Sequence, residues 1–162
     1  MKHILSTIEY LMISIVLYFI INIMIKNHIV LCPPFHSVFD ELIHTVPYQS
    51  IHPIPFIFVT CISFLITQLL VCRIYFKHIF FNYLLFYMLW LLLSCVIGGG
   101  LWSYYDMEAG WYPQGLLLIK KILNDIKLGV LLGPGMVIMS IPYNLLILIS
   151  SFLILRYNKI IT

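Results

Sequence analysis

Four long apolar runs constrain what this chain can fold into more than any other feature of its sequence. They cover residues 5–25, 55–72, 79–102 and 128–155. A helix needs about 20 apolar residues to cross the hydrocarbon layer of a bilayer, and lipid offers an unpaired backbone amide no partner. The runs therefore predict an all-α integral membrane protein with four transmembrane helices. Pro134 and Pro142 lie inside the fourth run, which predicts that this helix is kinked or tilted.

The composition excludes most soluble classes of protein. Of the 162 residues, 62% are hydrophobic and only 9% are charged. A soluble domain of this size leaves about a third of its surface exposed, and this chain has too few polar residues to cover it. The net charge of +3 is small and no basic cluster exceeds the pair Lys120 and Lys121, so nucleic acid is not an expected partner. We expect a single membrane domain over residues 1–162, with the lipid bilayer as its first partner.

The first run and the cysteines narrow this class further. No small-x-small cleavage site follows the first run, so we expect it to be retained as a helix and not removed as a signal peptide. The cysteines contain no CxxC pair, which argues against a thiol oxidoreductase. They are Cys32, Cys61, Cys72 and Cys95. Only Cys32 lies outside the apolar runs, in the first predicted outer loop.

Basic residues give the predicted orientation in a bacterial inner membrane. The N-terminus, the short turn after the second run and the C-terminal tail hold Lys2, Arg73, Lys77, Arg156 and Lys159. The other two loops, residues 26–54 and 103–127, hold Lys26, Lys120, Lys121 and Lys127. Because cytoplasmic loops carry the excess of lysine and arginine, we expect both termini in the cytoplasm and these two loops on the outer face.

The first outer loop contains the most patterned stretch of the chain. Its apolar residues recur at helical spacing, which predicts a short amphipathic helix on the outer surface between Pro34 and Pro47. The opposite face carries His36, Ser37, Asp40, Glu41 and His44. The ligand types of His36, Asp40 and His44 suit zinc, but two helical turns separate the outer pair by about 12 Å. We therefore predict no metal site and no cofactor.

The second outer loop begins with aromatic residues and carries Asp106 and Glu108. Two carboxylates serve general acid–base catalysis only beside a nucleophile and a pocket, and no such pattern accompanies them. They are interpreted as an anionic rim.

Residues 116–127 predict a second interfacial helix in this loop. Its apolar face consists of Leu116, Ile119, Ile122, Leu123 and Ile126, and its solvated polar face of Lys120, Lys121, Asn124, Asp125 and Lys127.

A few small and polar residues interrupt the apolar runs. Gly129 and Gly133 form a small-xxx-small pair that favours close helix packing, and the glycines at 98–100 either loosen the third helix or admit a neighbour. Glu9 lies near the cytoplasmic end of the first run and is interpreted as a terminal residue that reaches the interface, not as part of a proton path. Asn144 and Gln68 are expected to pair with each other across helices through their side-chain amides.

Residues 33–47 resemble the first periplasmic loop of the colicin A/colicin N type immunity proteins. The shared features are a proline-rich start, an apolar-patterned segment and the ending Ile43-His44-Thr45-Val46-Pro47, in which valine replaces the alanine of the family pattern. The size, the four spans and the orientation are also similar. The resemblance implies a non-enzymatic role in which the protein recognises the pore-forming domain of its own colicin within the bilayer and prevents channel opening.

Three classes of function follow from these observations. The first is protein–protein recognition, with candidate partner-binding residues His36, Asp40, Glu41, His44, Thr45, Asp106 and Glu108. The second is a periplasmic-face membrane enzyme using the histidines and acids of the outer loops. The third is an accessory or transport subunit, for which the mid-depth polar residues are Thr60, Thr67, Gln68, Ser94, Ser140 and Asn144. No catalytic motif is present, and the first class is favoured.

Overall fold

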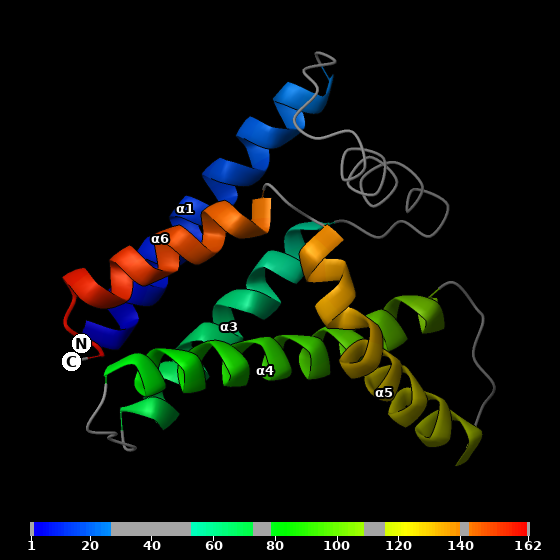
Figure 1. The fold of residues 1–162 in the computed structure, drawn as a ribbon. Coiled ribbons are helices and arrows are strands. Elements are labelled where there is room, and N and C mark those ends of the chain that lie inside the picture. Colours follow the sequence, from blue (N-terminus) through cyan, green and yellow to red (C-terminus); the bar gives the residue numbers. More distant parts are fainter. Residues whose placement is uncertain (1, 27–52, 73–78, 109–115, 140–142, 162) are drawn as a thin grey trace.

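The computed structural model describes residues 2–26, 53–72, 79–108, 116–139 and 143–161, and every regular element in these ranges is an α-helix. The helices are α1 (Lys2–Lys26), α3 (Pro53–Val71), α4 (Ile79–Glu108), α5 (Leu116–Met139) and α6 (Tyr143–Tyr157) (Figure 1). The predicted all-α class is confirmed for these parts of the chain.

Two helices are long and apolar enough to cross a membrane. The stretches that qualify by length and composition are Lys2–Ile21 of α1 and Ile79–Tyr104 of α4. Shorter apolar stretches, Ile57–Val71 and Tyr143–Tyr157, lie in α3 and α6. Length and hydropathy therefore support a membrane location through two of the four predicted spans.

The third and fourth runs end elsewhere than predicted. Helix α4 continues to Glu108, because the first residues able to end it are Gly110 and Pro113. The predicted interfacial helix over residues 116–127 is the first half of α5, which passes through Pro134 without ending. The run over residues 128–155 contributes to two of the described helices, α5, which extends to Met139, and α6, which starts at Tyr143.

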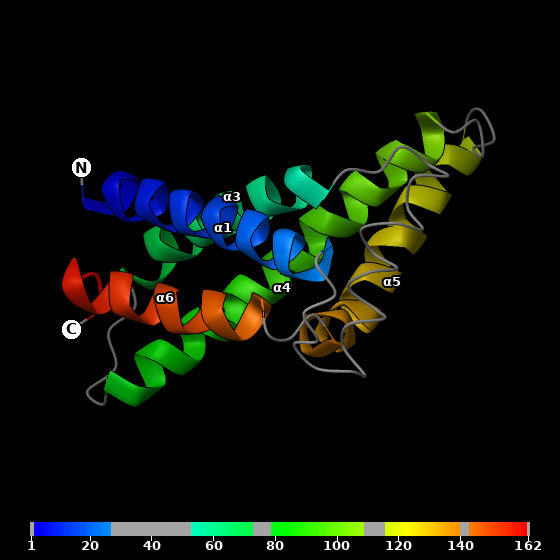
Figure 2. The same cartoon turned by 90° about the horizontal axis from the view of Figure 1, so that it is seen from above.

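The helices pack in a chain of neighbours. α1 lies against α3 and α6, α3 lies against α4, and α4 carries α5 on its C-terminal half (Figures 1 and 2). α5 diverges from α6 in both views, so the pair formed by α4 and α5 extends to one side of the other helices. The two ends of the chain lie together at the start of α1 (Figure 1).

Four aromatic side chains join α1, α3 and α4, and we call them the aromatic cluster: Tyr10, Phe64, Phe86 and Trp90. The rings of Tyr10 and Phe64 stack with centroids 4.5 Å apart, and Trp90 meets Phe64 edge-on at 5.3 Å. The Trp90 indole also donates to the carbonyl of Thr60 over 3.0 Å, so its polar atom has a partner inside the protein.

Many large apolar side chains are exposed, and several hydroxyl and amide side chains are buried. Fully buried side chains include Ser6, Ser14, Ser63, Thr67, Gln68 and Ser151, while Ile4, Ile8, Met12, Phe80, Met88 and Leu131 are exposed. Several buried hydroxyls donate to the carbonyl one turn earlier in their own helix, as Ser14 does to Tyr10 over 2.8 Å. The surface thus presents many apolar side chains to its surroundings, and the interior holds hydrogen-bonded polar groups beside the aromatic cluster.

Candidate functional site between α4 and α5

The residues predicted to bind a partner lie largely outside the described ranges. His36, Asp40, Glu41, His44 and Thr45 fall within residues 27–52, which are not described. Asp106 and Glu108 belong to the C-terminal end of α4, and their side chains are not described. Within the described ranges, no group of three or more histidines, cysteines and acids is arranged to hold a metal ion.

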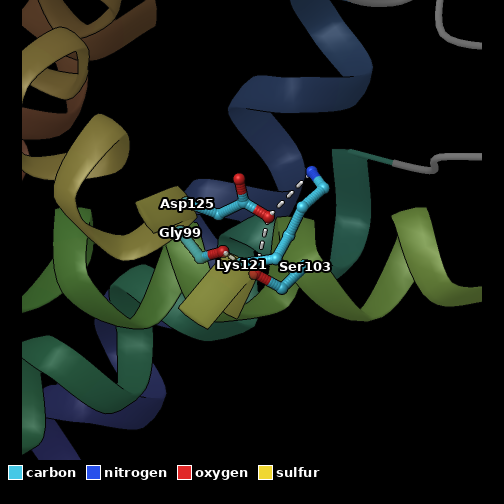
Figure 3. Close-up of polar contacts among 4 residues, drawn as sticks. All are labelled: Gly99, Ser103, Lys121 and Asp125. Carbon is cyan, nitrogen blue, oxygen red and sulfur yellow. Dashed lines mark hydrogen bonds and ion pairs between the residues drawn. The ribbon is translucent and has the colours of Figure 1, made fainter. Parts of the chain in front are cut away.

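A buried carboxylate between α4 and α5 forms the centre of the candidate site. Asp125 of α5 is only 7% exposed, and its Oδ2 accepts a hydrogen bond from the Ser103 hydroxyl of α4 over 3.1 Å (Figure 3). The ammonium of Lys121 lies 3.5 Å from the same oxygen, one helical turn earlier in α5. The carboxylate is therefore both neutralised and hydrogen-bonded, as a charge removed from water requires.

The geometry of this cluster suits holding two helices together better than nucleophilic catalysis. The Ser103 hydroxyl has one proton, and it lies within hydrogen-bond distance of Asp125 and of the Gly99 carbonyl, at 3.3 Å (Figure 3). Both acceptors belong to the protein itself. The proton is thus directed along the helix interface and not toward a substrate.

Next to the cluster of Asp125, Ser103 and Lys121, α4 and α5 pack against each other through very small side chains. A Cβ added to Gly99 would lie 2.8 Å from the carbonyl oxygen of Asp125, and one added to Gly129 would lie 2.6 Å from that of Cys95. A Cβ on Gly133 would collide with the Cys95 sulfur. We call these residues the small-residue seam: Cys95, Gly99, Gly129 and Gly133. The predicted role of the Gly129–Gly133 pair in close packing is confirmed, and its partner is α4 of the same chain.

The solvated position predicted for Asp125 is wrong. The prediction assigned it to the polar face of an interfacial helix, whereas the structure buries it against α4. The reason is visible in the spacing, because Asp125, Gly129 and Gly133 recur every fourth residue and share the face that packs on α4. This repeat of small or polar residues indicates the face that packs on α4. The prediction instead took the face with Ile119 and Leu123 as the one buried in the membrane.

A second buried polar group joins α1 to α3. The side-chain carbonyl of Gln68 accepts from the Ser6 hydroxyl over 2.7 Å and lies 3.3 Å from the His3 ring nitrogen Nδ1. Its amide nitrogen donates to the Thr7 hydroxyl over 3.4 Å. Gln68 is completely buried. Gln68 does join two helices, but its hydrogen-bond partners are His3, Ser6 and Thr7 of α1 and not the predicted Asn144.

Glu9 lies at the end of the molecule where the chain begins and ends. The Asn158 amide, which directly follows α6, donates to the Glu9 carboxylate over 2.7 Å. The position of Glu9 near one end of the fold agrees with its predicted assignment as a terminal residue. No protein-family model, curated protein or solved structure matches this chain, so the geometry of its own residues carries the functional argument.

Proposed function

We propose that this chain is a four-span protein of the bacterial inner membrane that acts by recognising another membrane protein. The observation that carries the membrane location is the large number of exposed isoleucine, leucine and phenylalanine side chains, together with serine, threonine and glutamine side chains that are buried and hydrogen-bonded. In water such a surface would be a large apolar patch, whereas in lipid it is the stable arrangement.

The position of the termini supports an even number of crossings. α1 and α6 pack side by side, and Glu9 near the start of α1 contacts Asn158 just after α6. α1, α3 and α4 supply three crossings in this proposal. The fourth is completed by α6, which returns the chain to the side on which α1 begins. The basic residues at both ends favour the cytoplasm for that side.

Recognition is proposed to be of the immunity type, directed against a pore-forming colicin. The resemblance of residues 33–47 to the periplasmic loop of that family supports this choice. His44 and Thr45 of this loop are the proposed partner-binding residues. The exposed apolar stripe of α1, which includes Ile4, Ile8 and Met12, supplies a lipid-facing surface on which a membrane-inserted toxin helix can pack.

Protection in living cells tests this proposal. The chain is expressed in a colicin-sensitive bacterium, its presence in the membrane fraction is verified, and the cells are exposed to a panel of pore-forming colicins. We expect survival against one member of the panel, and loss of that survival in a His44→Ala/Thr45→Ala variant that reaches the membrane at the same level. Killing by every colicin in the panel, with the protein present in the membrane, would overturn the immunity role.

A further inference from the structure

We propose that the outward face of α5 binds the phosphate groups of anionic lipid through Lys120 and Lys127. The inference rests on the membrane location proposed above but is independent of colicin recognition. We define the outward stripe of α5 by its exposed residues Lys120, Leu123, Asn124, Lys127 and Leu131.

The outward stripe lies opposite the face that packs on α4. Successive residues of a helix turn by about 100°, so Lys120 and Lys127 lie about 20° apart and about 140–180° from Asp125 and Gly129. Asp125 and Gly129 contact α4 directly. The two ammonium groups are therefore attached to the side of α5 that its neighbour leaves uncovered, and both lysines are exposed.

The charges on this stripe have no counter-charge among the described residues. Lys121 belongs to the other side of the helix, where Asp125 lies 3.5 Å from its ammonium. No described carboxylate lies within ion-pair distance of Lys120 or Lys127. The stripe thus presents two uncompensated positive charges about 10 Å apart along the helix axis. An anionic phosphate is the complementary group, and in a membrane it is supplied by lipid.

The surrounding residues place these lysines near the headgroup layer. α5 runs antiparallel to α4, since Asp125 meets Ser103 whereas Gly129 meets Cys95. The apolar stretch of α4 ends at Tyr104, so Asp125 lies close to the end of that stretch and Lys120 lies farther out.

Apolar neighbours accompany the lysines on the exposed side of α5. Ile119 and Leu123 are 58% and 61% exposed, as expected of side chains immersed in the acyl boundary. Lys127, one turn deeper than Leu123, reaches the phosphates by extending its alkyl stem outward.

Headgroup cross-linking tests the proposal on the full chain. The protein is reconstituted in nanodiscs that carry a photoactivatable phosphatidylglycerol or a phosphatidylcholine with the same reactive group, and adducts are mapped by peptide mass spectrometry. On residues 116–131 we expect the anionic probe to exceed the zwitterionic one by about fivefold. Lys120→Gln/Lys127→Gln removes this preference. Lys2→Gln/Lys159→Gln, which deletes the same charge from exposed lysines at the other end, leaves it intact.

The outcomes separate this inference from the proposed function. Equal labelling of residues 116–131 by the two probes in the wild type, or a preference that survives Lys120→Gln/Lys127→Gln, overturns the lipid site. Loss of the preference in an excess of inorganic phosphate also overturns it, because the site would then bind free phosphate. Absence of adducts on every helix would instead contradict the membrane location itself.

Discussion

At the scale of single residues, a few buried polar side chains determine how the helices are joined. Gln68 links α3 to α1, and Asp125 links α5 to α4. In a membrane the apolar side chains gain little from contact with each other compared with lipid, so such polar contacts and close packing specify the partners. Their loss leaves an unpaired group inside the protein.

Asp125→Asn is predicted to weaken the junction of α4 and α5. The amide keeps the volume and a hydrogen-bond acceptor for Ser103, but Lys121 loses its counter-charge. We expect the free energy of unfolding to fall by about 1–2 kcal/mol, since Lys121 is part-exposed and screened. Denaturant titration of the full chain in detergent micelles measures it. Asn124→Ala, at the exposed neighbouring position, is the control and should change stability by less than about 0.5 kcal/mol.

Lys159→Gly is predicted to stabilise the end of α6. Lys159 has a φ of 50°, its own amide donates to the carbonyl of Arg156 over 3.2 Å, and the Ile160 amide donates to the carbonyl of Leu155 over 3.0 Å. This is the Schellman motif, in which glycine avoids the steric cost of the left-handed conformation. We expect a gain of about 1 kcal/mol by thermal unfolding. Lys159→Ala keeps the Cβ and should give no gain, so equal effects of the two substitutions would contradict the explanation.

At the scale of helices, the small-residue seam explains why α5 packs on α4 through the face that carries Gly129, Gly133 and Asp125. Gly99 and Gly129 let the two backbones approach more closely than any other side chain would permit. Close approach multiplies the van der Waals contacts, which replace the hydrophobic driving force that lipid removes. The same closeness makes the seam sensitive to a single added methyl group.

Gly99→Ala is predicted to be far more damaging than Gly100→Ala. A Cβ at Gly99 would meet the Ile126 Cα at 2.9 Å, whereas one at Gly100 has nothing within 4 Å. We expect overpacking to cost about 1–3 kcal/mol at Gly99 and helix propensity to make the Gly100 change neutral or slightly favourable. The rate at which a maleimide labels buried Cys95 reports opening of the seam. Equal labelling rates in both variants would refute this account.

Helix positions were predictable from the sequence to the extent that apolar runs mark them. The run over residues 79–102 gave the start of α4 at Ile79, but not its end at Glu108, because residues 103–108 contain no helix breaker despite their polarity. Pro134 and Pro142 are both residues that can end a helix, and the sequence alone does not distinguish them. In the structure, Pro134 lies inside α5 and Pro142 directly precedes α6. Asp125 was misplaced because its burial depends on α4, which lies far away in the sequence.

At the scale of the whole molecule, the fold brings the two termini to one end. The side-by-side packing of α1 and α6 and the Asn158–Glu9 hydrogen bond define this arrangement. Ile161, next to the last residue, is also buried in the hydrophobic core, which fixes the tail after α6. In the proposed four-span arrangement, this places both ends on the same side of the membrane.

Reporter fusions are predicted to place both termini in the cytoplasm. Green fluorescent protein fluoresces only in that compartment, and alkaline phosphatase is active only in the periplasm. We expect fluorescence from fusions at either end, and phosphatase activity when the enzyme is fused after Gly110, beyond α4. Opposite results at the two termini would contradict the packing of α1 against α6. Phosphatase activity at both termini would reverse only the orientation.

The aromatic cluster has a consequence for following this fold in solution. Tyr10 and Phe64 are inclined by 14°, and Phe64 meets Phe86 at 83°, so the rings are held in a fixed asymmetric array. Such arrays give near-ultraviolet circular dichroism, which disappears when specific packing is lost. Loss of this signal would thus be a built-in optical readout of loosening at the α1–α3–α4 junction.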